Sequence, residues 1–357
     1  MLKTEELIAT YKIRWFTVFK EYVRSGCEQI RKLQDETSLS AIASMEFSML
    51  YTNLLDRRYV ADLFVYSEKL YLDKTQRFID SYDISDIFVY FDKLWDDLLV
   101  LRKRYVGKVS ARDITTLMLR TLPDFYSVLE GIARFAIAEL ADKSPFININ
   151  KSEKFLVNVG DYMAGTHTVY TEWQNKDEIA QQLYDNPADI GILGDYSGLD
   201  FSGKDLSQLD LRYAQFRGST LKETDFYSSL LTGANFRNAN MEGCYIEDCS
   251  IFEADFSFAN LKNASFMFSE QDRMAVEEEP RFPRLLPTHF HCADLTDADL
   301  NGANLTGADF TGANLTRADF TGANLTGADF TGAELTGAVF TDVKLTGAIF
   351  SEEITSK

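Results

Sequence analysis

The sequence is poor in cysteine, proline and histidine, and these shortages narrow the class of protein. Its four cysteines, Cys27, Cys244, Cys249 and Cys292, are scattered and form no Cys-x-x-Cys pair. This usage argues against a disulfide-stapled secreted scaffold and is typical of reduced thiols, so we expect a cytoplasmic protein. Six prolines in 357 residues argue against a proline-rich linker.

Long apolar stretches and basic charge are also scarce. No apolar run reaches the roughly 18 residues that a membrane-spanning helix needs, and the charged segment from Met1 to Leu7 does not resemble a secretory signal. The 36 Lys and Arg residues are outnumbered by 55 Asp and Glu residues, which gives a net charge of −19. Such a charge repels nucleic acid and anionic membranes and favours basic partners. We therefore expect a protein partner, and no direct contact with nucleic acid or membrane.

Sequence signatures of catalysis are missing as well. The chain has no phosphate-binding glycine loop, no His-Glu-x-x-His motif and no Gly-x-Ser-x-Gly motif. His289, His291 and Cys292 raise the question of a metal site, but no second pair of ligands lies nearby, so we favour no metal. No nucleophile, base and orienting group can be assembled. We expect a non-enzymatic protein without catalytic residues or cofactors.

Residues 1–145 show mostly helical spacing of apolar side chains. Ser110 and Asp113 form a capping pair before the apolar residues that begin at Ile114. We interpret the many aromatic residues as core, with a ligand pocket between helices as the alternative. We predict an α-helical bundle, with helical stretches at 5–33, 39–78, 84–105 and 124–140.

The pattern changes between residues 146 and 193. Phe146 to Ile149 and Phe155 to Val159 look like short strands, and a short helix is expected near Asp177 to Tyr184. We interpret this segment as a joint that caps the first coil of the next domain, because an open coil would expose apolar surface and strand edges. The chain as a whole is expected to be an α+β multidomain protein.

Internal repetition dominates the rest of the chain. A large apolar residue, numbered i, returns every five positions, and the residue at i−2 is usually small. In a first block of 15 units, i runs from Tyr196 to Phe266, and in a second block of 12 units it runs from Leu295 to Phe350. Phe290 is a candidate extra unit.

Strand geometry explains this spacing. Residues i−2 and i point to the same side of an extended segment. Because five is odd, a straight strand would send the next pair outward, so the chain must turn within every unit. The turn positions i+1 and i+2 are often Thr-Gly, as at Thr306-Gly307, and glycine accepts a positive φ there. We predict a coil with i and i−2 inside, where Cys244 and Cys249 fill corners.

The alternation of Phe and Leu indicates the number of sides. From Leu305 to Phe350 the two residue types alternate strictly. A three-sided coil would mix them in each column, whereas a four-sided coil keeps each column pure and stacks Phe310, Phe330 and Phe350. We therefore predict four sides and, at roughly 4.8 Å per coil, about seven coils over residues 194–350, followed by a tail at 351–357.

The units Ala-Asn-Leu-Thr-Gly at 303–307 and Ala-Asp-Phe-Thr-Gly at 308–312 resemble the A(D/N)LXX motif of pentapeptide-repeat proteins. The resemblance covers residues 194–266 and 288–350. It implies a right-handed quadrilateral β-helix, and the handedness comes from the resemblance alone. It says nothing about residues 1–190.

The repeat is interrupted at residues 267–292. A loop of this length in a compact solenoid is typically functional or disordered. Its apolar and basic part is a candidate partner-binding tip, and a tolerated surface insertion is the alternative. The candidate residues are Arg281, Phe282, Arg284, Leu285 and Leu286.

Acidic residues recur at i−1 in the second block. Asp299 and Asp319 share one column and Asp309 and Asp329 share another, and we take the four as a candidate acidic face. Columns of carboxylates on a narrow rod resemble the charge display of a DNA duplex; solubility is the alternative interpretation. Some pentapeptide-repeat proteins bind type II topoisomerases by mimicking DNA, so the resemblance implies DNA gyrase, or another DNA-binding protein, as a candidate partner.

We therefore hypothesise a non-enzymatic interaction protein that presents acidic solenoid faces and a protruding loop. Its helical domain would supply a second contact surface or a homodimer interface. Two alternatives stay open. One is gyrase protection by DNA mimicry, although those proteins dimerise through a C-terminal helix and lack a helical domain of this size. The other is an enzyme or effector in the helical domain that the solenoid targets.

Overall fold

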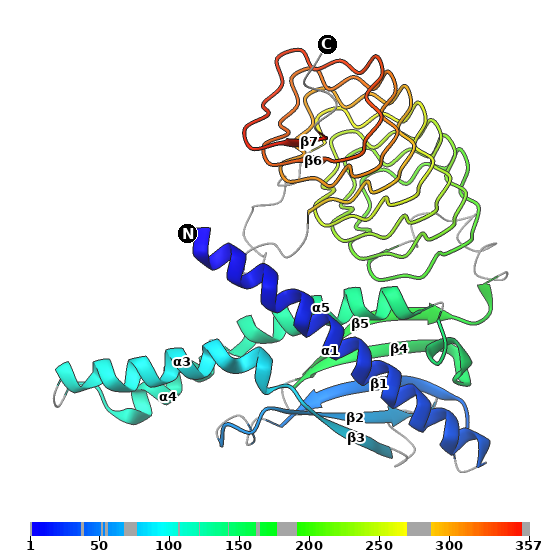
Figure 1. Cartoon of the computed structure of the whole chain (residues 1–357). Coiled ribbons are helices and arrows are strands. Elements are labelled where there is room, and N and C mark those ends of the chain that lie inside the picture. The colour runs from blue at the N-terminus through cyan, green and yellow to red at the C-terminus, as the bar shows by residue number, and fades with distance from the viewer. Residues whose placement is uncertain are drawn as a thin grey trace. The chain divides into compact units, whose positions relative to one another are not determined.

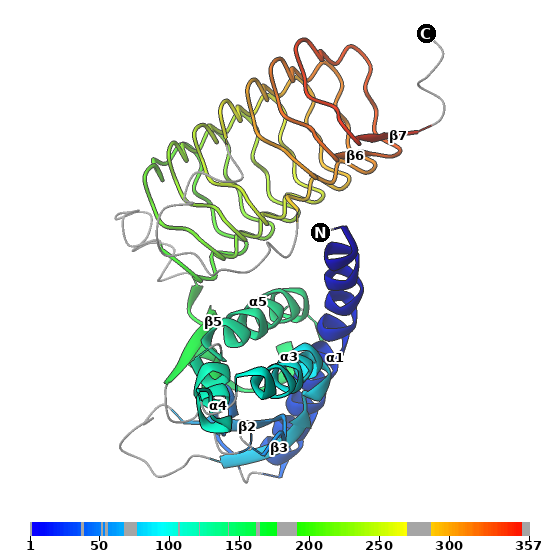
Figure 2. The same ribbon diagram turned by 90° about the vertical axis from the view of Figure 1, so that its left-hand side faces the viewer.

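The chain forms two compact units in a computed structural model, one ending at Gln174 and one beginning at Asn175. Figure 1 and Figure 2 show them from two directions, and each unit is described by itself. The structure describes residues 2–36, 39–50, 53, 56–67, 77–105, 108–120, 122–141, 143–161, 165–176, 191–269 and 287–351.

The N-terminal unit is built on a five-stranded mixed sheet with the order β3-β2-β1-β4-β5 (Figure 1). The strands are β1 (Ile42–Met49), β2 (Val60–Tyr66), β3 (Arg77–Asp83), β4 (Lys151–Asp161) and β5 (Gly165–Trp173). β1 and β4 are parallel, and the other neighbours are antiparallel. Ser44 lies opposite Leu156, so the centre of the sheet joins segments that are distant in sequence.

Two helices pack on the same face of this sheet. Phe47, Val159 and His167 are cross-strand neighbours on that face. The Phe19 ring of α1 lies 5.1 Å from the Phe47 ring, and Glu130 of α5 contacts His167 at 2.7 Å. The described helices are α1 (Leu2–Asp35), α3 (Ser85–Leu101), α4 (Ala111–Arg120) and α5 (Leu122–Leu140), with short 3-10 turns at Arg102–Arg104 and Phe146–Asn148.

The capping pair predicted from the sequence is present at the start of α4. The backbone N–H of Asp113 donates to the Ser110 hydroxyl at 3.2 Å, and the backbone N–H of Ser110 donates to the Asp113 carboxylate at 2.6 Å. These reciprocal bonds satisfy two backbone donors that a helix start would otherwise leave without partners. They lower the pKa of the Asp113 carboxyl.

The predicted all-helical bundle is wrong for residues 39–78, which contain β1, β2 and the start of β3. In β1 the apolar Met45, Phe47 and Met49 alternate with polar residues, which is the two-residue period of a strand. The density of apolar residues also satisfies a helical spacing, and this hid the alternation.

The segment 146–193, predicted as a joint, supplies β4 and β5 to this sheet. Phe146–Asn148 is a 3-10 turn instead of a strand. The short helix expected near Asp177 to Tyr184 lies outside the described residues. The segment therefore contributes to the core of the N-terminal unit as well as leading into the repeats.

The C-terminal unit is a coil in which each turn of the chain pairs with the next by isolated parallel bridges (Figure 2). Asp299 pairs with Asp319, and Asp309 pairs with Asp329. Only the pairs in β6 (Asp329–Phe330) and β7 (Ile349–Phe350) are long enough to count as strands among the described residues of this unit. The spacing of four five-residue units per coil, which the alternation of Phe and Leu predicts, is therefore confirmed.

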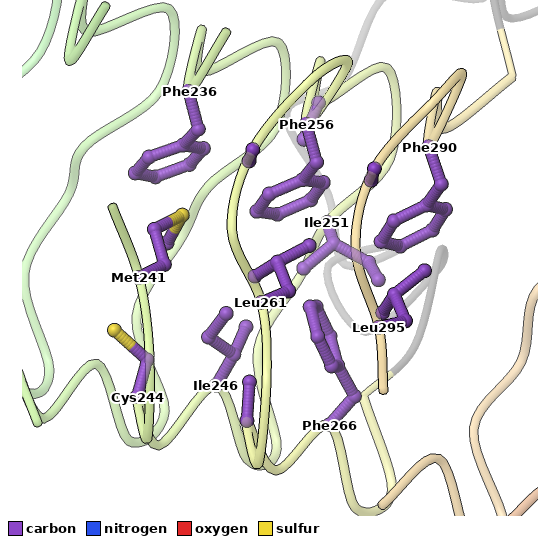
Figure 3. Close-up of a cluster of buried hydrophobic side chains, with 14 of the residues drawn as sticks. Phe236, Met241, Cys244, Ile246, Ile251, Phe256, Leu261, Phe266, Phe290 and Leu295 are labelled. Carbon is purple, nitrogen blue, oxygen red and sulfur yellow. The ribbon is translucent and has the colours of Figure 1, made fainter. Parts of the chain in front are cut away.

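A column of stacked rings fills one side of the interior. Successive members such as Phe290, Phe310 and Phe330 lie 4.8 and 5.0 Å apart with interplanar angles of 4° and 5°. Figure 3 shows the same stacking for Phe236, Phe256 and Phe290, so Phe290 is a full unit of the repeat. These rings are buried, as the assignment of position i to the interior requires. The column comprises Tyr196, Phe216, Phe236, Phe256, Phe290, Phe310, Phe330 and Phe350.

Small polar residues at i−2 are accommodated inside because they bond to backbone carbonyls. The Ser219 hydroxyl donates to the carbonyl of Tyr196 at 2.8 Å. The Cys244 thiol donates in the same way to Leu221 at 2.7 Å, and Cys249 repeats the arrangement. Burial raises the pKa of the Cys244 thiol to about 12, so it stays protonated and acts as a donor.

The insertion begins and ends at one side of one coil. Asp255 pairs with His289, so one coil step here takes more chain than the step from Asp309 to Asp329. Ser269 and Thr288, at either end of the insertion, are fully buried. Their hydroxyls donate to the carbonyls of Ile246 and Ile251 respectively. Both stems are therefore fixed to the solenoid interior.

Candidate protein interface of the solenoid

The outside of the solenoid consists of four walls, which we label A to D in chain order. Positions i and i−2 of each unit fill the interior, and positions i−1, i+1 and i+2 form the walls, where several side chains of walls A and D, such as Asn235 and Glu253, are nonetheless buried. Each wall is defined by its i residues and by the bridges that join its units. Wall A contains the units centred at 196, 216, 236, 256, 290, 310, 330 and 350, wall B those at 201, 221, 241, 261, 295, 315 and 335, wall C those at 206, 226, 246, 266, 300, 320 and 340, and wall D those at 211, 231, 251, 305, 325 and 345.

Wall C carries acidic but no basic side chains at its outward positions. It has no lysine or arginine at i−1, i+1 or i+2 in any of its units, and its one basic residue, Lys204, stands at i−2 of the first unit. The outward carboxylates average one per coil, so the wall carries negative charge along its length. They are Asp205, Asp225, Glu247, Asp248, Asp299, Asp319 and Asp342.

Walls A, B and D carry bases as well as acids, and several of these form ion pairs within the wall. Arg237 contacts Asp255 at 3.1 Å on wall A, and Lys222 contacts Glu242 at 2.8 Å on wall B. These pairs join neighbouring coils and reduce the net charge of their walls. A further pair of this kind is Arg317–Asp297 on wall B. On wall D the ion pair Arg212–Asp210 lies within a single unit and reduces the net charge of that wall without joining two coils. The four walls therefore differ in charge although their interiors are alike.

The four aspartates predicted as one acidic face lie on two walls. Asp299 and Asp319 pair on wall C, and Asp309 and Asp329 pair on wall A. In a four-sided coil these walls are opposite, so a flat partner cannot contact all four. The prediction of a single face is wrong because it grouped residues by their position in the unit and did not separate the columns by side.

These aspartates also hold the turns of their own units. The Asp309 carboxylate accepts the backbone N–H of Thr311 at 2.9 Å and its hydroxyl at 2.6 Å. Burial raises the pKa of Asp309, but hydrogen bonds from His289 and from Thr311 outweigh it and bring the pKa to about 2. At Asp319 the hydrogen bond from the Thr321 side chain lowers the pKa. Both carboxylates are thus ionised above strongly acidic pH.

Three aromatic side chains interrupt the carboxylates of wall C, and sequence reasoning missed them. Tyr227, Tyr245 and Phe268 are 46%, 51% and 61% exposed. A methyl group built on Gly302 of the next coil would lie 2.9 Å from the Phe268 ring, so this ring lies over Gly302. The signal was available, because sorting outward residues by column after subtracting the insertion places all three rings in neighbouring coils.

Lateral contacts on the walls show which outward residues are neighbours. Position i+1 of one unit and position i−1 of the unit in the next coil contact each other on several walls. On wall C the Glu247 carboxylate accepts the Ser265 hydroxyl at 2.6 Å, and on wall A Arg237 reaches Asp255. Tyr227 and Tyr245 occupy the same two positions, so the two tyrosines are neighbours in adjacent coils of wall C.

The remaining predicted sites are the loop residues and the cluster of His289, His291 and Cys292. Arg281, Phe282, Arg284, Leu285 and Leu286 lie outside the described residues. On wall A, His291 contacts the Thr311 hydroxyl at 2.7 Å, and the Cys292 sulfur lies 3.4 Å from His291 Nε2. Within the described part of the chain, no three His, Cys, Asp or Glu side chains are grouped as a metal site would require.

None of the described helices combines the length and the apolar composition that crossing a bilayer would take.

A coil of stacked five-residue units with an apolar interior defines a repeat solenoid of the β-helix class. Residues 197–226, 229–266, 288–327 and 313–352 match the family of pentapeptide repeats, in eight copies. The C-terminal part of this chain therefore consists of pentapeptide repeats, as its motif predicted. No curated protein matches the chain.

Several solved structures are similar to this chain. A pentapeptide repeat protein from the thylakoid lumen of Arabidopsis thaliana is 28% identical over 36% of this chain and 70% of its own, with a TM-score of 0.20. HetL, a pentapeptide repeat protein involved in heterocyst differentiation regulation in Nostoc sp. strain PCC 7120, is 24% identical over 49% and 97%, with a TM-score of 0.24. QnrB1, a plasmid-mediated fluoroquinolone resistance protein, is 25% identical over 45% and 80%, with a TM-score of 0.20.

Proposed function

We propose that the protein is a non-enzymatic scaffold that binds a basic protein surface through wall C. The observation that carries this proposal is the difference between the walls. Walls A, B and D combine acids with bases, whereas wall C has carboxylates and no lysine or arginine at its outward positions. A rigid, acidic wall attracts a basic partner over roughly a Debye length, about 8–10 Å at physiological salt.

Gyrase binding by DNA mimicry is the second candidate. The i−1 column of wall C supports it, since Asp205, Asp225, Asp299 and Asp319 repeat along the rod. The lower charge density of wall C argues against recognition by DNA mimicry. A duplex carries about one charge per 1.7 Å, whereas wall C averages one carboxylate per coil of roughly 4.8 Å. We expect a supercoiling assay with excess protein to show no change; inhibition that DNA competes away would favour gyrase instead.

The proposed function is tested with two triple variants that have the same change in net charge. One is D225N/D299N/D319N on wall C, and the other is D200N/D294N/D329N on walls A and B. In every case the aspartate accepts the backbone N–H at position i+1 of its own unit, which asparagine can also do. The two variants therefore share their turn chemistry and differ in the wall they neutralise.

The measurement is quantitative affinity capture from the source cell with the wild type and both variants. We expect a basic protein that the wild type and the control variant retain and that the wall C variant loses. Equal loss of the captured protein with both variants would show that the carboxylates act only through the total charge of the solenoid. A partner retained by all three proteins would overturn wall C as the interface.

A further inference from the structure

An arginine of this chain already shows how a solenoid wall binds a guanidinium group. On wall A the Arg237 guanidinium lies 5.4 Å from the centroid of the Phe258 ring, and one of its nitrogens lies 3.1 Å from Asp255. Asp255 stands at i−1 and Phe258 at i+2 of a single unit in the next coil. A carboxylate and a ring in such a unit are therefore spaced to hold one arginine side chain.

Wall C contains the same two kinds of group at other positions of its units, with Tyr227 at i+1 and Tyr245 at i−1, and it has no arginine or lysine at its outward positions. Asp225 and Tyr227 belong to one unit, where the backbone N–H of Tyr227 donates to the Asp225 carboxylate at 2.8 Å. Tyr245 and Glu247 belong to the unit of the next coil. Each unit thus offers an exposed ring and a carboxylate together.

The following two coils add a third combination. The Phe268 ring lies over Gly302, which stands at position i+2 of the unit that has Asp299 at i−1. This ring is the most exposed of the three. Four neighbouring units of wall C therefore supply three rings and at least three carboxylates.

We propose that this part of wall C binds an extended protein segment whose arginine side chains stack on Tyr227, Tyr245 and Phe268. The proposal rests on the proposed function and names the chemistry of the partner. The guanidinium groups pair with Asp225, Glu247 and Asp299 while their planes lie on the rings.

The dimensions of the wall fit an extended segment. The three rings belong to units that span two coil steps, and Asp299 extends the surface to a third, so it covers roughly 10–14 Å at about 4.8 Å per coil. Three side chains on one face of an extended strand span about 13 Å, since alternate side chains are roughly 6.6 Å apart. A segment of the form Arg-x-Arg-x-Arg therefore matches the three combinations.

Arginine fits this surface better than lysine. Its guanidinium is planar, stacks on aromatic rings and bonds to a carboxylate with two nitrogens, whereas the lysine ammonium is a compact, strongly hydrated charge. Carboxylates alone would attract both residues about equally. Preference for arginine therefore isolates the contribution of the rings from general electrostatic attraction.

The test measures fluorescence anisotropy of the full chain with labelled Gly-Arg-Gly-Arg-Gly-Arg-Gly and with the corresponding lysine peptide. We expect the wild type to bind the arginine peptide at least about fivefold more tightly. The double variant Tyr227→Ser/Tyr245→Ser should lose this preference and keep the affinity for the lysine peptide. The variant D225N/E247Q/D299N should weaken both peptides about tenfold or more.

Two controls separate recognition from folding and from total charge. Tyr105→Ser removes a tyrosine of similar exposure, 52%, from the N-terminal unit, and should change neither affinity. D200N/D294N/D329N should lower both affinities less than the wall C variant. Unchanged circular dichroism and unfolding temperatures show that the variants are folded.

Equal affinities for the two peptides, or a preference that survives loss of both tyrosines, would overturn arginine recognition. Such a result would not decide the proposed function, because affinity capture with the carboxylate variants tests that function independently of these rings. Arginine preference combined with a partner that ignores wall C in the capture experiment would instead sink the proposed function.

Discussion

The two units of this protein bury their apolar residues by different rules. In the solenoid the position of a residue within its repeat unit decides whether it is inside, and its neighbours lie one coil earlier and one coil later. In the N-terminal unit the register of β1 depends on β4, a strand that comes much later in the chain. Periodic burial is visible in a sequence, whereas burial that depends on distant pairing is not. Single substitutions in each unit test this difference.

The largest effect is expected from removing a ring of the interior stack. Phe330 is fully buried between Phe310 and Phe350, at 5.0 and 4.9 Å. Phe330→Ala loses these contacts and leaves a cavity, so the free energy of unfolding should fall by about 3–5 kcal/mol. Urea unfolding followed by far-UV circular dichroism checks this. The control Thr326→Ser should cost under about 0.5 kcal/mol, and equal losses would contradict the inward assignment of position i.

A buried ion pair gives the next largest effect, in the N-terminal unit. The Lys151 side chain is 2% exposed and contacts Glu172 at 2.7 Å. Glu172→Gln leaves the ammonium buried without its counter-charge, which should cost about 3 kcal/mol. All three tryptophans, Trp15, Trp95 and Trp173, lie in this unit, so their fluorescence reports its unfolding.

The matched control for that ion pair lies on the solenoid surface. Glu242→Gln removes the partner of Lys222, a pair that is about half exposed on both sides. We expect no measurable loss of stability, because water replaces an exposed partner. A comparable loss from both substitutions would show that burial does not set the strength of these pairs.

Two glycines of the second block test the ring of Phe268. Gly302 and Gly307 both have positive φ, at 64° and 72°. A methyl group meets nothing within 4 Å at Gly307, but it meets the Phe268 ring at Gly302. Gly307→Ala should cost about 1 kcal/mol from the backbone alone, and Gly302→Ala about 2 kcal/mol. Only Gly302→Ala should also weaken binding of the arginine peptide.

The smallest predicted effect is the opposite response of the two units to acid. The folded pKa of Asp309, about 2, lies below its ordinary value of 3.8, so its contribution is complete above roughly pH 4 and is lost as pH falls toward 2. After allowance for solvent screening this amounts to about 1 kcal/mol. Burial raises the pKa of Glu46, so this carboxyl adds stability to the N-terminal unit as pH falls through that raised pKa, until the unfolded chain is protonated as well, and it opposes the exposed Asp113, whose pKa is lowered. Between pH 6 and 3, circular dichroism should detect weakening of the solenoid before tryptophan fluorescence changes, and Asp309→Asn should reduce that difference.

The solenoid was predictable to the level of single columns. The five-position spacing, the small side chains at i−2 and the alternation of Phe and Leu together predict which residues are inside and which partners lie one coil apart. The side of the tube on which an outward residue lies was less accessible, because the insertion shifts the numbering between blocks. This shift separated Phe268 from Asp299 in the sequence although their units are adjacent.

The N-terminal sheet could not be predicted in the same way. Ser44 and Ser48 of β1 are buried as well as Phe47, so both faces of the strand are covered and burial does not alternate along it. Capping, in contrast, is a local contact, and Ser110 and Asp113 were identified from sequence alone. A local contact such as this cap can be predicted from one short segment, whereas predicting the pairing of β1 with β4 requires information from distant parts of the chain.

The insertion between Ser269 and Thr288 marks a position at which the solenoid should accept a foreign sequence. Extra chain enters between Asp255 and His289, yet the rings of Phe256 and Phe290 stack at 5.1 Å as they do elsewhere in the column. The other three walls keep the register of the coils on both sides of the insertion. The length of an inserted sequence therefore has little effect on stability, because each doubling of loop length costs only about 0.6 kcal/mol of loop-closure entropy. An epitope or protease site exchanged into this position should leave the arrangement of wall C, and hence its recognition chemistry, unchanged.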